Sequence, residues 1–149
     1  RVPDQPGIAS SIFLSLARAG LNVDVIVQNT SREGTTDVSF TVAQTDAQQA
    51  EHLMKEISVE IGAESIEVDS NIAKVSIVGV GMRAHPGVAA EMFDALRRGG
   101  INIQMITTSE IKVTVVIDEN DCAEAVQCLH NAFKLDGVVI DEDADRATA

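Results

Sequence analysis

The 149-residue chain is 45% hydrophobic, which is enough apolar material for one ordinary core or two small ones. Aromatic residues make up 3% of the chain, without Trp or Tyr, so the core must consist mainly of Val, Ile, Leu and Ala. A formal net charge of −12 argues against a nucleic-acid partner, because phosphate backbones require clustered Lys and Arg, and Arg97-Arg98 is the only adjacent basic pair.

The first half of the chain shows alternating helix and strand signals. Pro6-Gly7 predicts a helix start near Ile8, because proline is accommodated in the first turn, and Gly20 is expected to end this helix. Residues 22–29, NVDVIVQN, alternate Val with other residues, which predicts a strand with its valines on the core. A second strand is expected over 35–42, after a turn at Gly34.

Further elements follow from the same kinds of signal. Asp46 is expected to cap a helix that ends at Gly62, and SIEV, residues 65–68, predicts a short strand. The second half predicts strands at 73–80, 102–108 and 111–117, helices at 87–98 and 121–134, and a candidate last strand at 137–141.

The second half repeats the first. A shift of 80 aligns Pro6-Gly7 with Pro86-Gly87 and Asn22 with Asn102, and a shift of 75 aligns Asp46 with Asp121. Each copy reads β-α-β-β-α-β, so we expect an α+β fold of two ferredoxin-like domains in tandem, with helices on one face of antiparallel sheets. The expected domains are 1–70, whose first strand is expected before Arg1, and 71–149, which ends in an acidic C-terminal tail.

No motif for catalysis, a metal or a cofactor stands out. Gly79-Val80-Gly81 follows a predicted strand, but Ala84 breaks even a loose dinucleotide fingerprint. Cys122 and Cys128 have no zinc spacing and do not favour a disulfide, and the histidines are scattered. No apolar run approaches the length of a membrane span and no signal segment is visible, so we expect a soluble, cytoplasmic protein without a membrane partner.

The loop before the first helix is a candidate site for a free amino acid. A helix N-terminus offers unpaired N–H groups and a positive dipole end to a carboxylate, and an acidic side chain can pair with the ammonium. The residues in these roles are Gly7, Ile8 and Ala9 for the carboxylate, Asp4 for the ammonium, and Asn22, Val23 and Gln28 for the remainder. The alternative is a plain helix cap with solvated Asp4 and Gln28, and Asn22 or Asn102 could instead bond the turn after its helix.

Differences between the copies bear on this choice. Asp4 corresponds to Ala84 and Gln28 to Thr108, while the scaffold residues persist. The first copy thus carries the polar groups for binding an amino acid, and the second copy keeps only the supporting scaffold. An unpaired sheet edge in a single copy also predicts a homodimer.

The segments VSIVGVGM, HPGVAAEMF and TTSEIKVTVVI resemble the paired ACT domains at the regulatory end of bacterial aspartate kinase. That enzyme is the first of the pathway to lysine, threonine and methionine. The resemblance implies feedback inhibition by threonine, lysine or both, and a partner that is an amino-acid kinase domain or a separate α subunit. We expect this chain itself to be non-catalytic.

The resemblance also implies residue roles. A threonine-type pocket would involve Asp4, Gly7, Ile8, Ala9 and Gln28, with Asn102 and Ile103 from the facing ACT domain. A second effector position would involve Ser31, His85, Val88, Ser109 and Glu110. A rival reading is an assembly module that dimerises the kinase through its ACT sheets and binds no effector, and another is an enzyme in its own right.

Overall fold

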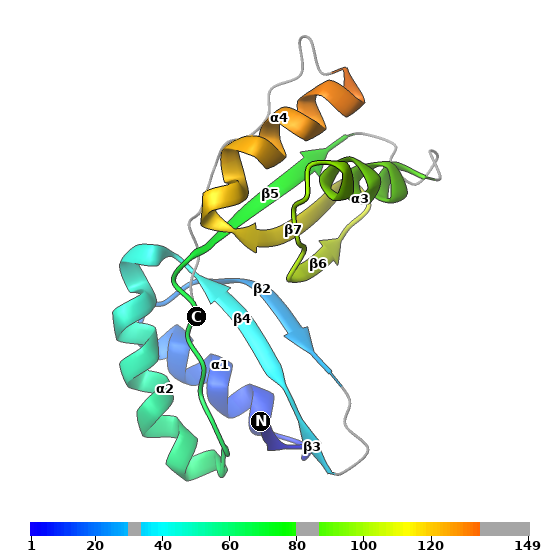
Figure 1. The fold of residues 1–149 in the computed structure, drawn as a ribbon. Helices are drawn as coiled ribbons and strands as arrows, with labels where there is room; N and C mark the ends of the chain where they lie inside the picture. The colour runs from blue at the N-terminus through cyan, green and yellow to red at the C-terminus, as the bar shows by residue number, and fades with distance from the viewer. Residues whose placement is uncertain (30–33, 80–86, 135–149) are drawn as a thin grey trace. The chain divides into compact units, whose positions relative to one another are not determined.

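A computed structural model describes residues 1–29, 34–79 and 87–134. The chain divides into two compact units, with the boundary between Ser70 and Asn71. Within the described ranges, each unit alternates strands with two helices (Figure 1).

In the part of the first unit that the structure describes, there are two helices and four short strands. In chain order these are β1 (Val2–Pro3), α1 (Ile8–Arg18), β2 (Val23–Gln28), β3 (Thr35–Thr36), β4 (Val38–Val42), a 3-10 turn (Gln44–Asp46) and α2 (Ala47–Ile61). β1 pairs antiparallel with β3, and β2 pairs antiparallel with β4. Only Asp37 separates β3 from β4, so these two form one interrupted central strand.

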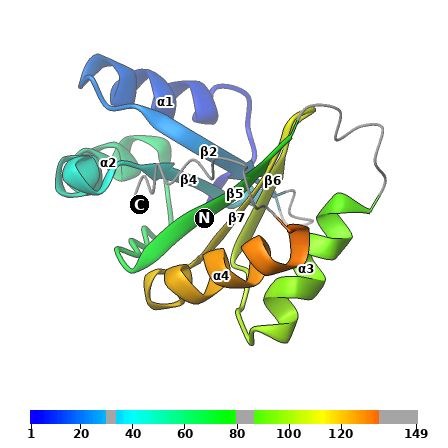
Figure 2. The ribbon, with the colours of Figure 1, turned by 90° about the horizontal axis from the view of Figure 1, so that it is seen from above.

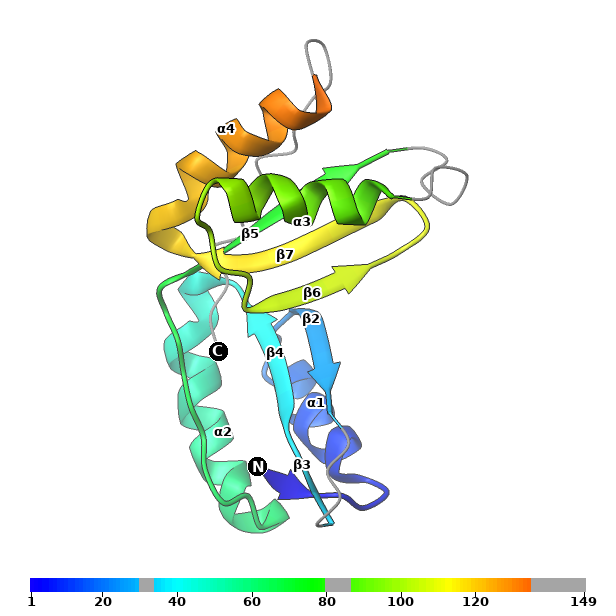
Figure 3. The same cartoon turned by 45° about the vertical axis from the view of Figure 1, so that its right-hand side comes forward.

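The second unit has a more regular sheet. Its elements are β5 (Ile72–Val78), α3 (Val88–Arg98), β6 (Met105–Thr108), β7 (Lys112–Asp118), a 3-10 turn (Glu119–Asp121) and α4 (Cys122–Phe133). Among the described residues, the strands pair antiparallel in the order β5-β7-β6, with β5 at one edge. Both helices lie on the same face of this sheet (Figures 2 and 3). The structure confirms the predicted fold class of antiparallel sheets with helices on one face.

Each unit has its own apolar core between helices and sheet. In the first unit, Leu16 of α1 and Ala50 of α2 are fully buried beside Phe40 and Val42 of β4. The rings of Phe13 and Phe40 meet edge to face, with centroids 5.6 Å apart. In the second unit, the cluster includes Met92 and Leu96 of α3, Val115 and Ile117 of β7, and Leu129 of α4.

Two expectations about the strands of the first unit were wrong. Residues 65–68 do not form a strand and are exposed, because β1 is too short to offer them an edge. Just before them, the Glu64 amide donates a hydrogen bond to the Arg1 carbonyl. The opening strand does not lie wholly before Arg1, since β1 occupies its place. The candidate strand at 137–141 lies outside the described residues.

β2 contains a bulge, which the sequence alternation does not predict. Val23 pairs with Val42 and Ile26 with Phe40, so two residues of β2, Asp24 and Val25, face one residue of β4. Directly opposed residues share a face, so Val23 packs on the core beside Val42, while Val25 is 5% and Ile26 is 52% exposed. These exposures follow the predicted alternation, which separates Val23, Val25 and Val27 from Asp24, Ile26 and Gln28.

Helix boundaries agree with the turn signals, with one difference at α2. Gly62 ends α2 in a left-handed conformation, φ 69°, as the glycine predicted. Asp46 stands at the N-cap, but its side chain makes no capping hydrogen bond, because a 3-10 turn leads directly into the helix. In the second unit, Asp118 caps the equivalent 3-10 turn by accepting the Asn120 amide.

Candidate functional site

The loop before α1 presents a helix N-terminus without a side-chain cap. Gly7 is the N-cap residue, with φ 102°, and no side chain bonds to the first turn. A Cβ built on Gly7 would meet nothing within 4 Å, so the space beside this backbone is open. Ile8 and Ala9, which begin the helix, are half-buried. The Ile8 amide donates to the Gln5 carbonyl at 3.4 Å. Binding of an anion by the amides of this turn stays a prediction.

Asp4 lies directly ahead of this turn at the edge of the sheet. Its amide donates to the Gly34 carbonyl at 2.9 Å, which continues the pairing of β1 with β3. The Asp4 side chain is exposed, and within the described ranges its carboxylate makes no ion pair. Its position suits a charged partner from solution.

Gln28 reaches the same end of the unit from the other side of the central strand. It pairs with Val38, which packs on the core below α1 and α2, so the Gln28 side chain projects from the helix-covered face. β2 ends, β3 begins and α1 starts at this end of the unit (Figure 1). The Thr36 hydroxyl donates to the Asn29 carbonyl and fixes the segment that follows Gln28.

Asn22 and Asn102 do not bond the turns that follow their helices. Those turns are closed by backbone amides, with Leu21 donating to Leu16 and Ile101 to Leu96, each at 3.0 Å. Both asparagines are exposed, and neither side chain bonds a described residue. Their neighbours Val23 and Ile103 are half-buried against the two cores. Asn102 and Ile103 belong to the second unit and remain predicted site residues.

The second predicted position is described only in part, because Ser31 and His85 lie outside the described residues. Val88 is the first residue of α3, after the N-cap Gly87 with φ 106°. Ser109 and Glu110 lie in the exposed hairpin turn between β6 and β7. The Ser109 amide donates to Lys112 at 2.7 Å and its hydroxyl accepts the Ile111 amide at 3.4 Å, so Ser109 closes the turn.

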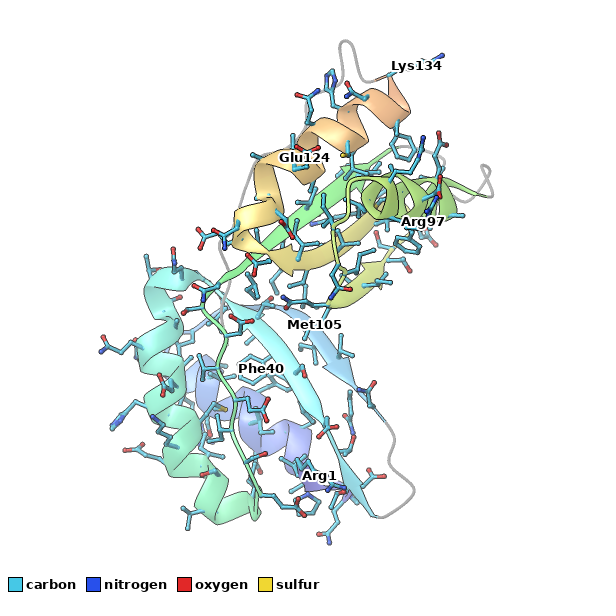
Figure 4. All side chains as sticks on the ribbon, in the orientation of Figure 1. Arg1, Phe40, Arg97, Met105, Glu124 and Lys134 are labelled. Carbon is cyan, nitrogen blue, oxygen red and sulfur yellow. The ribbon has the colours of Figure 1, made fainter. Side chains whose placement is uncertain are left out.

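Shifted pKa values occur on the helices of the second unit, apart from the predicted residues. Hydrogen bonds from Arg97 at 2.8 and 3.0 Å lower the pKa of Asp94 (Figure 4 labels Arg97). Burial raises the pKa of Cys128, and a hydrogen bond to Glu124 at 3.5 Å adds to this effect. A raised pKa keeps the Cys128 thiol protonated and a poor nucleophile.

The sequence did not predict an open groove between α3 and α4. Its volume is about 330 Å³, and its lining consists of Ala95, Arg98, Gly99, Glu124, Cys128, Asn131 and Ala132. Both cysteines are free thiols. In the part of the chain that the structure describes, no group of His, Cys, Asp and Glu is arranged to hold a metal, and no helix is long and apolar enough to cross a membrane.

Comparisons with known proteins decide the family. The ACT domain family matches residues 1–56 and 75–133. A crystal structure of aspartokinase alpha and beta subunits is 51% identical with a TM-score of 0.84, and the match covers 90% of this chain and 88% of that chain. This chain belongs to the regulatory ACT domains of aspartate kinase.

Other relatives agree with this assignment. The ligand-free regulatory subunit of aspartate kinase from Thermus thermophilus is 42% identical, with a TM-score of 0.82 and coverage of 89% and 87%. An aspartate kinase of Pseudomonas fluorescens is 53% identical over 135 residues, which are 91% of this ACT chain and 33% of that enzyme. This chain therefore spans about a third of that relative's length. E. coli aspartokinase III in complex with lysine and aspartate is 28% identical, with a TM-score of 0.62 and coverage of 85% and 27%.

Proposed function

We propose that this chain is the feedback-regulatory part of an aspartate kinase and that it binds an end-product amino acid, threonine, lysine or both. The binding lowers the phosphorylation of aspartate by the catalytic domain or α subunit that it accompanies. Membership in the aspartate kinase ACT family supports this role, and the lysine complex of E. coli aspartokinase III supports an amino acid as the ligand. We place the protein in the cytoplasm, where this biosynthesis takes place.

The uncapped N-terminus of α1 carries the proposal for the first unit. Amides of Gly7, Ile8 and Ala9 hold the effector carboxylate, where the partial positive charge of the helix end is favourable. Asp4, exposed one turn ahead, pairs with the ammonium group. Gln28 binds the side chain of the effector from the helix-covered face of the same end.

The second unit has the same scaffold with fewer polar groups. Gly87 repeats the left-handed N-cap of Gly7, with open space beside it. Thr108 stands where the first unit has Gln28, and Ala84 stands in the sequence where it has Asp4. We therefore assign the principal effector contacts to the first unit, residues 1–70, and a supporting role to the second, residues 71–149. Asn102, Ile103 and the second set of Ser31, His85, Val88, Ser109 and Glu110 extend this proposal to further contacts.

Inhibition follows from linkage. An effector shifts the kinase toward an inactive arrangement only by the difference in its affinity for the two arrangements, typically about 1–3 kcal/mol. We propose that the ACT sheets also form a homodimer, since β5 is an edge strand among the described strands, in the order β5-β7-β6. This same edge supports the second candidate function, a dimerisation module that binds no effector.

Calorimetric titration of the 149-residue chain with threonine, and separately with lysine, tests the proposal. We expect a saturable heat for at least one of them and none for a matched amino acid such as glycine, which lacks the side chain that Gln28 would contact. An absence of heat for both at millimolar concentration contradicts effector binding and favours the dimerisation module. Sedimentation of the same samples measures the oligomeric state independently.

A further inference from the structure

The bulge in β2 has a side-chain partner on the neighbouring strand. Thr41 of β4 is 1% exposed, and its hydroxyl accepts the Val25 amide at 3.1 Å in a buried position. A bulge leaves one residue without its usual ladder partner, and here the Thr41 oxygen takes the place of a backbone carbonyl. A buried amide without an acceptor would be costly, so this hydroxyl stabilises the bulge.

The second unit has neither the bulge nor the hydroxyl. Thr41 corresponds to Val116 in the repeat, and Val25 corresponds to Met105. Met105 pairs directly with Val116, Ile106 with Val115 and Thr108 with Val113, in unbroken register. The Gln104 amide there donates to the Val116 backbone carbonyl at 2.8 Å. Thr41 therefore occurs in the unit whose bulge requires a side-chain acceptor.

The bulge sets the register of the residues on either side of it. From the pairing of Ile26 with Phe40, a regular strand would place Asp24 opposite Val42, on the core side. With the bulge, Val23 takes this place and packs on the core, and Asn22 precedes it at the exposed strand end. Gln28 follows in regular pairing beyond the bulge.

We propose that Thr41 is a positioning residue for the effector response: its hydroxyl holds the bulge that places Asn22 and Val23 relative to Gln28. Thr41 itself is buried and is not an effector contact. The inference rests on the proposed function, because it assigns to Thr41 the geometry of that same site.

Substitutions of Thr41 separate the effect of its hydroxyl from the effect of its side-chain shape. Thr41→Val keeps the branched Cβ and removes the acceptor, while Thr41→Ser keeps the acceptor and removes a methyl group. Thr114→Val is the matched control, because Thr114 is also a buried threonine, 3% exposed, and its hydroxyl pairs with Ser76 in the regular sheet of the second unit. All variants are made in the 149-residue chain.

Amide hydrogen exchange and calorimetric titration with threonine and lysine provide two readouts. We expect Thr41→Val to speed exchange at Val25 far more than in the rest of the chain, because this amide loses its buried acceptor. We also expect it to weaken effector binding about tenfold, because Asn22 and Val23 lose their position relative to Gln28. We expect Thr41→Ser and Thr114→Val to bind as the wild type does. Equal binding by wild type and Thr41→Val, or equal loss in Thr114→Val, overturns the positioning role.

Different results would contradict the proposed function and the positioning role of Thr41. If the wild-type chain binds neither amino acid, the proposed function fails and the positioning role with it, whatever Val25 exchange shows. If the wild type binds and Thr41→Val binds equally well, only the positioning role fails. Loss of binding in Thr41→Val with rescue by Thr41→Ser supports both.

Discussion

A Cβ added to Gly99 would lie 2.8 Å from the Sγ atom of Cys128, so the thiol of α4 occupies the space that a side chain on the end of α3 would need. Further atoms are close, with the Ile101 Cδ1 at 3.3 Å and the Leu96 carbonyl oxygen at 3.4 Å. Gly99 has φ −75°, an ordinary helical value. Packing against Cys128, and not backbone conformation, therefore restricts this position.

This relationship predicts that Gly99→Ala is destabilising in the wild-type chain. Overpacking costs about 1–3 kcal/mol, which exceeds the gain of about 0.4–1 kcal/mol from a less flexible unfolded chain. In a Cys128→Ala background the clash is removed, and we expect Gly99→Ala to be neutral or stabilising. Urea unfolding of both single variants and the double variant measures this coupling. Additive effects would show that Cys128 does not restrict the position.

Asp4→Asn is expected to weaken effector binding and to leave stability unchanged. The ammonium group would lose a charged partner, which at an exposed site corresponds to about 0.2–1 kcal/mol, or up to about fivefold in affinity. Glu60→Gln is a suitable control, since it removes the same charge from an exposed position on α2. Calorimetric titration measures the affinities, and equal losses in both variants would indicate a general effect of charge.

Gly7→Ala tests whether the conformation of the helix N-cap matters for binding. The residue has φ 102°, where an L-residue is strained by about 1–2 kcal/mol. Gly87→Ala is the matched variant, because Gly87 has φ 106° at the same place in the second unit. We expect similar losses in melting temperature for the two variants and a loss of effector affinity mainly for Gly7→Ala. Equal losses of affinity would contradict the assignment of the principal contacts to the first unit.

The Asp94 interactions predict a contribution to stability that depends on pH. The folded-state pKa of this carboxyl is lowered, first by the Arg97 hydrogen bonds and then by the Arg97 and Arg98 charges, so its contribution is present above the unfolded pKa of about 3.9. It is lost as the pH falls through the folded-state value. Asp94→Asn should therefore flatten the acid side of the stability profile below about pH 5. Chemical unfolding at a series of pH values measures the slope, and an unchanged slope would contradict this role.

Local signals in the sequence predicted most of the fold because they act within one element. Pro6-Gly7 and Gly20 bound α1, Gly62 ends α2, and the repeat extends the same pattern to the second unit. The sequence also placed Gln28 at the end of a strand. The face of the sheet on which its side chain lies is decided only by the register with Val38.

The features of the fold that the sequence predicted wrongly or did not predict depend on interactions between distant residues. Whether 65–68 forms a strand depends on the length of β1, far earlier in the chain. The bulge depends on Thr41, which lies 16 residues after Val25. The repeat contained a signal for it, since Thr41 replaces Val116 at a buried position, but hydrophobic alternation alone predicts a regular strand.

The contact between Gly99 and Cys128 also limits how the two copies can be recombined. The aligned positions in the first copy hold Ala19 at the end of α1 and Leu53 in α2. A chimera that grafts the first helix of one copy into the other would bring Ala19 against Cys128, or leave a gap beside Leu53. Helices of the two domains are thus exchangeable as matched pairs and not singly, so a designed hybrid should transplant α1 together with α2.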